Sequence, residues 1–163
     1  MEDNPYSAPN AAIAEVVPHG ETELASLGER FAGALIDGLI MLALLLPVMF
    51  LAGYFDGGLP SLGTQLFYGL VGFGVFCAVQ FYPLGQSGQT WGKRAMKTRI
   101  VDLEGNKPPL GVLIGKRYLP VQAVGMVPVI GNLLMLVDSL LVFRADRRCG
   151  HDLIAGTRVI KAR

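Results

Sequence analysis

The sequence predicts an all-α integral membrane protein with two full transmembrane helices, a short helical hairpin and a small cytoplasmic two-stranded β element. Of its 163 residues, 52% are hydrophobic and 17% are charged, whereas a soluble domain carries about 25% charged residues. Residues 31–55 hold one charge and residues 57–92 hold none. Both stretches exceed the roughly 20 apolar residues that cross a bilayer as a helix. The net charge of +1 gives no indication of a nucleic-acid partner.

Residues 1–23 are acidic and rich in Ala, Pro and Asn. This composition predicts a disordered tail, because it offers little apolar surface to bury. The tail has no basic region followed by a short apolar run, so we expect no cleavable signal peptide. Residues 24–163 are expected to form one membrane domain, entered through a helix that Thr22 or Ser26 caps. The spans are predicted at about residues 31–53, 62–84, 110–127 and 131–144.

The first span carries Asp37 inside its apolar sequence. An aspartate at the centre of a membrane helix costs roughly 2.5 to 3.5 kcal/mol on insertion scales, so its presence calls for an explanation. Arg30 lies seven residues earlier, on nearly the same helix face and about 10 Å away along the axis. Gly33 lies between them, and small residues allow a neighbouring helix to approach closely. This polar stripe is therefore expected to face other helices and not lipid.

The second span presents small and weakly polar residues on one face, which is formed by Gly69, Gly72, Phe76 and Gln80. Gln80 can hydrogen-bond a neighbouring carboxylate or the backbone, and both alternatives stay open. The exit from Gly88 to Lys93 has some likeness to a phosphate-binding loop. However, it is one residue short, Arg94 replaces the required Ser or Thr, and a helix precedes it where such loops follow a strand. We expect no nucleotide site there.

Four basic residues follow the second span: Lys93, Arg94, Lys97 and Arg99. We expect them to contact the anionic headgroups of the lipid bilayer, with Trp91 at the membrane interface. Two short β-branched runs, at residues 98–103 and 157–161, are predicted to pair as antiparallel strands, since neither would be stable alone. Their pairing requires both runs to lie on the same side of the membrane.

The last apolar block, residues 118–143, can be one span or two short ones. One span would give three crossings and place many Lys and Arg residues of the tail outside, against the positive-inside rule. Pro128 and Gly131 also form a helix-breaking cluster near its middle. We therefore predict a short hairpin, re-entrant if need be, with Lys116 and Arg117 extending to the headgroups. Both termini are then cytoplasmic, with three crossings as the alternative.

No combination of residues predicts catalysis or a cofactor. Cys77 and Cys149 lie in an apolar span and a basic tail, so we expect no disulfide. Cys149 and His151 lack the two further ligands of a metal site, and no second base accompanies a nucleophile. The sequence therefore predicts no metal, no cofactor and no enzyme.

The arginine at the start of the first span and the two aspartates, Arg30, Asp37 and Asp138, resemble the signature of the RDD family of bacterial membrane proteins. Further matches lie in the middle loop and the closing segment, at residues 88–94, 99–102, 105, 117 and 147–159. The second aspartate of the signature is either Asp138 or Asp152. The resemblance implies a multi-pass protein of the bacterial inner membrane. The family is usually described as transporters, with cation/proton exchange proposed for some members.

Two functions remain open for the intramembrane charges. With both termini on one side, Asp37 and Asp138 lie at matched depth near Arg30, supported from the cytoplasmic side by Arg117, Asp152, Lys93, Arg94 and Arg99. They can form a structural ion-pair core beneath an adaptor or lipid-facing surface. Alternatively, they can bind a small cation or a proton for transport, such as sodium/proton exchange. So few helices would require a homo-oligomer for transport.

Overall fold

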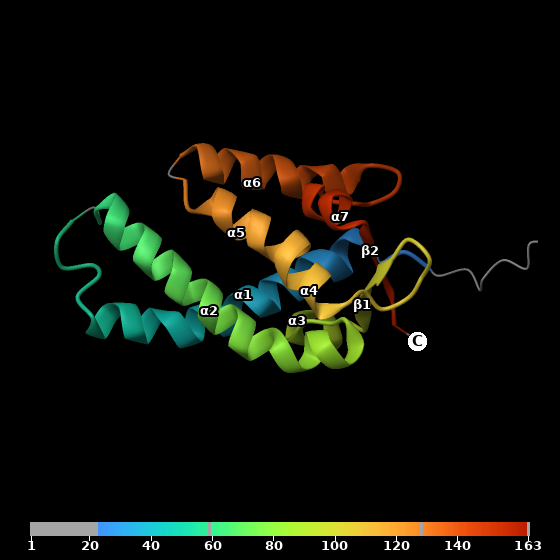
Figure 1. The fold of residues 1–163 in the computed structure, drawn as a ribbon, viewed down its shortest axis with the longest axis horizontal. Helices are drawn as coiled ribbons and strands as arrows, with labels where there is room; N and C mark the ends of the chain where they lie inside the picture. Colours follow the sequence, from blue (N-terminus) through green and yellow to red (C-terminus); the bar gives the residue numbers. More distant parts are fainter. Residues whose placement is uncertain (1–22, 59, 128, 163) are drawn as a thin grey trace, which may run out of the picture.

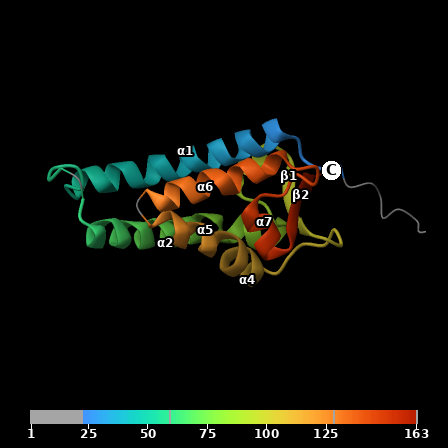
Figure 2. The ribbon, with the colours of Figure 1, turned by 90° about the horizontal axis from the view of Figure 1, so that it is seen from above.

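The computed structural model describes residues 23–58, 60–127 and 129–162. Of the predicted disordered tail, only Glu23 falls within this part of the chain. The described residues are mostly helical, with one small antiparallel sheet. Figures 1 and 2 show an elongated molecule in which helices run lengthwise and turn back at one end, while the sheet lies at the other end.

The two longest helices are α1 (Leu27–Leu51) and α2 (Leu62–Ser87). Ser26 begins α1 with a capping box: its hydroxyl accepts a hydrogen bond from the amide of Glu29, and the Glu29 carboxylate accepts one from the amide of Ser26. Both helices are long and apolar enough to cross a membrane, and few of their residues are buried. In α1 only Gly33 and Asp37 are buried.

The predicted hairpin consists of several short pieces. Its first arm contains α4 (Leu110–Val112), a π-helical turn η1 (Leu113–Tyr118) and α5 (Leu119–Gly125). Its second arm contains α6 (Ile130–Leu140) and the 3-10 turn η2 (Leu141–Phe143). The helix breaks in the predicted region, and the arms touch at the turn, where a side chain at Gly131 would overlap the carbonyl of Val124. In Figures 1 and 2 this hairpin does not extend as far as the α1–α2 turn.

Strands β1 (Thr98–Asp102) and β2 (Thr157–Lys161) pair antiparallel with Ile100 opposite Val159, which confirms the predicted pairing. The segment before α1 joins them, because Leu24 forms a β-bridge with Ile160. A small core lies beneath the sheet and consists of Ala25, Leu84, Ile100, Leu113 and Val159. Two short helices complete this end of the molecule: α3 (Trp91–Ala95) and α7 (Gly150–Ala155).

Candidate functional site

Asp37 holds α3 against the first long helix. Its Oδ1 accepts hydrogen bonds from the Gln80 side chain at 3.0 Å and from the Gly92 amide at 2.8 Å. Its Oδ2 accepts one from the Thr90 hydroxyl at 2.5 Å. The same Thr90 oxygen caps α3 by accepting from the Lys93 amide. Each oxygen of the carboxylate is thus occupied, and all of its donors are uncharged.

The close approach of α3 to α1 depends on glycine. Gly33 lies one turn before Asp37, and the backbones of Gly33 and Gly92 meet so closely that a side chain at position 92 would overlap the carbonyl of Gly33. Gln80, which is fully buried, links this contact to α2, because its Oε1 accepts from the amide of Trp91 at 3.0 Å. The face of the first span that carries Gly33 therefore packs against a helix, as predicted. Gln80 bonds both a carboxylate and the backbone, the two alternatives that the sequence left open.

Asp152 is the centre of a second network. Its Oδ2 lies 2.5 Å from a guanidinium nitrogen of Arg30, and its Oδ1 pairs with Arg117. The amide of Cys149 and the hydroxyl of Thr157 also donate to this carboxylate, at 3.2 Å each. The side chain of Asp152 is fully buried, so the ion pairs are shielded from solvent. This carboxylate therefore joins α1, η1, α7 and β2.

The charge state of Asp152 follows from these neighbours. Burial by itself raises the pKa of a carboxyl group, but the guanidiniums of Arg117 and Arg30 outweigh it and hold the pKa of Asp152 well below its usual range. Asp152 is consequently ionised throughout the physiological pH range. Its single negative charge balances one of the two arginine charges. Arg117 is almost wholly buried, with 1% of its surface exposed.

Asp138 pairs with His151 and not with an arginine. Its two oxygens accept from the backbone amide and from the Nδ1 of His151, each at 2.7 Å. The other ring nitrogen, Nε2, lies 3.3 Å from a guanidinium nitrogen of Arg117. Because a guanidinium can only donate, Nε2 is the acceptor and the proton sits on Nδ1. Burial, only partly offset by the hydrogen bond to Asp138, lowers the pKa of His151, in agreement with a neutral ring.

Asp138, Cys149 and His151 place three atoms that could bind a metal within 4.8 Å of one another. The sequence had suggested only Cys149 and His151 as such a pair. Two guanidiniums already contact this group, however. Arg30 lies 3.3 Å from the Cys149 sulfur, and Arg117 lies 3.3 Å from the His151 ring. A divalent cation would face both positive charges, so the donors fit a hydrogen-bonded network better than a metal centre.

The predicted residues thus fall into three places. Arg30, Arg117 and Asp152 form one network, to which His151 connects Asp138. Asp37 belongs to a separate set of hydrogen bonds. Among the described residues, Arg30 forms its salt bridge with Asp152 and not with Asp37 or Asp138. Arg94 and Arg99 are exposed on the surface, and Lys93 is only partly buried.

Two placements can be compared with the sequence-based expectation. Arg117 was expected either to extend to the headgroups or to join the ion-pair core. The π-helical turn directs it inward, where it pairs with Asp152. Asp138 and Asp37 were expected to share one site at a common depth, but each bonds to a different segment that follows a span. Sequence reasoning also missed Thr90, whose place three residues before Lys93 is that of a helix cap.

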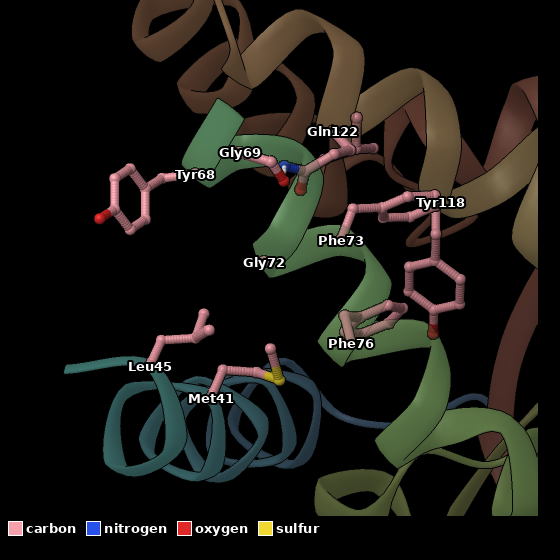
Figure 3. A pocket seen from close by; sticks show the side chains of 10 residues that line it. Met41, Leu45, Tyr68, Gly69, Gly72, Phe73, Phe76, Tyr118 and Gln122 are labelled. Carbon is pink, nitrogen blue, oxygen red and sulfur yellow. Dashed lines mark hydrogen bonds between the residues drawn. The ribbon is translucent and has the colours of Figure 1, made fainter. Parts of the chain in front are cut away.

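A cavity of about 450 Å³ lies between α1, α2 and α5. Figure 3 shows the side chains that line it. Gly69 and Gly72 form one wall, and Phe76 packs against Tyr118 with ring centroids 4.9 Å apart. Gln122 donates to the carbonyl of Gly69 at 3.0 Å. The lining contains no charged residue, so neither Asp37 nor Asp152 reaches this cavity.

Two long, exposed apolar helices and a set of buried charges at one end indicate a helical membrane protein. The comparison with known families agrees. The chain belongs to the RDD family, whose model matches residues 24–156, as the arginine and aspartates of the sequence suggested.

One relative is an uncharacterized protein of Haemophilus influenzae. It is 30% identical over 140 residues, which cover 84% of this chain and 78% of the relative. No solved structure matches the chain.

Proposed function

We propose that the protein is a multi-pass protein of the bacterial inner membrane in which buried Arg and Asp residues form a structural core. This core would hold a small cytoplasmic unit, made of the sheet with α3 and α7, rigidly against the membrane helices. The exposed basic residues of that unit, Arg94, Lys97 and Arg99, would face anionic headgroups or a partner protein. The protein would thus act as a scaffold or adaptor.

The proposed orientation rests on the distribution of the chain ends and charges. Leu24, β1 and β2 are bonded to one another and therefore lie on one side of any membrane that the helices cross. The chain must therefore come back to this side between Leu24 and β1 and again between β1 and β2. Four helical segments, two before β1 and two after it, allow this. The turns at the far end, residues 52–61 and 126–129, hold no Lys or Arg, whereas the sheet end holds nearly all of them. The positive-inside rule then makes the sheet end cytoplasmic.

Reporter fusions test this orientation. We expect a reporter after β2 and a reporter in the turn at residues 103–106 to be active in the cytoplasm. A reporter at residues 54–57 should be active only on the opposite side. Paired alkaline phosphatase and fluorescent-protein fusions measure this directly. If the fusions after β2 and at 103–106 reported opposite sides, the four-segment arrangement would be wrong.

One observation favours a structural role over cation transport: every oxygen of Asp37 and Asp152 is bonded to a donor from another segment. A cation site needs free oxygen lone pairs, and hard cations take six or more oxygen ligands. The cavity between the long helices offers no carboxylate to an ion. Transport of sodium or protons is therefore the competing hypothesis that an experiment must exclude.

Two substitutions of Asp37 separate these hypotheses. Asn keeps Oδ1 for Gln80 and Gly92, and its amide can donate to the Thr90 oxygen, so we expect the Asp37→Asn protein to remain nearly as stable as wild type. Ala leaves three buried donors without an acceptor, each costing about 1–3 kcal/mol, so unfolding of Asp37→Ala in detergent should be easier by about 3 kcal/mol or more.

Ion flux completes the test. In proteoliposomes with imposed sodium, potassium or proton gradients, we expect wild type and Asp37→Asn to move no more ions than empty vesicles. If wild type carried an ion and the equally stable Asp37→Asn protein did not, Asp37 would be a transport residue and the scaffold proposal would fail.

A further inference from the structure

A groove of about 560 Å³ separates the beginning of α1 from the end of α6. Its walls are apolar and largely exposed, with Phe31 and Ala34 on α1 and Leu140 and Phe143 on the second arm of the hairpin. The groove is thus lined by exposed side chains of the apolar helices. If these helices lie in a membrane, its open side faces acyl chains and not water.

The charged residues that line the groove are cationic. Arg30, Lys93 and Arg117 line it, and no carboxylate does. Asp152 pairs with both arginines but does not line the groove, so the charges that reach the groove surface are positive. These positive charges attract an anion into the groove and repel a cation.

Among the three cations, Lys93 has the free hydrogen-bond donors needed to hold an anion, and Arg117 keeps one unpartnered donor, its buried Nε. Arg30 already bonds the Arg147 carbonyl, the Cys149 sulfur and Asp152, and Arg117 bonds Asp152, Thr157 and His151. Within the described ranges, the Lys93 ammonium has no hydrogen bond or ion pair. Burial, followed by repulsion from Arg117, lowers the pKa of Lys93 to about 8. An anion in the groove would supply the missing partner.

We propose that this groove binds one anionic phospholipid, with its phosphate against Lys93 and Arg30 and an acyl chain between α1 and α6. A phosphate oxygen accepts charge-assisted hydrogen bonds from an ammonium, and the apolar walls suit a hydrocarbon chain. Most lipids around a membrane protein touch it without being held in place. A lipid in this groove would differ from them, because the cationic residues of the groove would hold its phosphate. The proposal depends on the membrane insertion proposed above.

Lipid binding can be measured by native mass spectrometry of the full chain in detergent, titrated with phosphatidylglycerol, with phosphatidylcholine or with inorganic phosphate alone. We expect phosphatidylglycerol to bind at one site, more tightly than phosphatidylcholine, and inorganic phosphate not to bind detectably. Lys93→Gln should weaken phosphatidylglycerol binding about tenfold, as for the loss of one charge-assisted hydrogen bond. The matched control is Lys116→Gln, an exposed lysine that does not line the groove and should leave affinity unchanged.

A second pair of variants tests the apolar part independently. Ala34→Trp places a large ring inside the groove and should reduce lipid binding as much as Lys93→Gln does. Leu35→Trp, on the exposed side of α1 outside the groove, should not. Unfolding in detergent serves to check that all four variants are folded.

Three results would overturn the proposal. The first is equal lipid affinity in both groove variants and both controls. The second is binding of inorganic phosphate as tight as that of the lipid, which would make the site one for a free anion. The third is a dimer that Ala34→Trp dissociates, which would make the groove an interface between copies of this chain. None of these bears on the reporter fusions, so the lipid site can fail while the proposed orientation stands.

Discussion

Replacing Asp152 by asparagine is expected to destabilise the protein by about 3–5 kcal/mol, the usual cost of removing one partner of a buried ion pair. The substitution leaves Arg30 and Arg117 facing each other without a counterion. The new amide nitrogen would also face one of the two guanidiniums, and both groups can only donate. The free energy of unfolding in detergent, followed by circular dichroism, measures the effect.

Asp146→Asn is the matched control, since it makes the same change a few residues earlier in the tail. Asp146 pairs with Arg144 on the surface at 3.3 Å, with both side chains well exposed. Exposed pairs contribute about 0–1 kcal/mol, so this variant should be close to wild type. Similar losses in the two variants would mean that Asp152 is not the buried centre of the network.

Replacing Gly92 by alanine is expected to cost about 3 kcal/mol, at the upper end of what overpacking costs. The added methyl group would overlap the carbonyl of Gly33 and lie 2.8 Å from the Asp37 carboxyl carbon. The carbonyl of Gly33 is backbone and cannot move aside without shifting α1, and the Asp37 carboxylate can move only by giving up its hydrogen bonds. Separating α3 from α1 also weakens the hydrogen bonds of Thr90 and Gly92 to Asp37. Unfolding in detergent should reveal the loss.

Gly38→Ala serves as the comparison for Gly92→Ala, because a methyl group at position 38 would meet no other atom within 4 Å. Alanine is the better helix former, so this variant should be as stable as wild type or slightly more so. If Gly92→Ala proved equally harmless, the close contact between α3 and α1 would not exist in solution.

Local signals were sufficient to predict much of the fold. Thr22 and Ser26 were the two predicted caps of the first helix, and Ser26 is the residue that caps α1, with Glu29 completing a capping box. The similar β-branched runs at 98–103 and 157–161 pair as expected, and the helix breaks near Gly131. In each case, the residues that determine the structure are neighbours in the sequence or repeat a simple pattern.

The partners of the charges could not be predicted in the same way. Spacing along α1 places Arg30 and Asp37 on one face, but it does not say which other segment reaches that face. Asp37 meets α3, a helix of five residues that is too short to carry a periodic signal. Arg30 was expected to lie with Asp37 and Asp138, but its partner depends on how the tail folds back: Arg30 pairs with Asp152, and Asp138 bonds His151.

The position of Asp152 in the chain has a consequence for synthesis in the cell. Arg30 and Arg117 leave the ribosome well before Asp152. The helices α1, α2, α5 and α6 also precede Asp152 in the sequence. Until α7 and β2 are made, the two guanidiniums have no counterion and β1 has no neighbouring strand. Synthesis of residues 150–161 therefore has to precede the closing of the end of the molecule that holds the sheet.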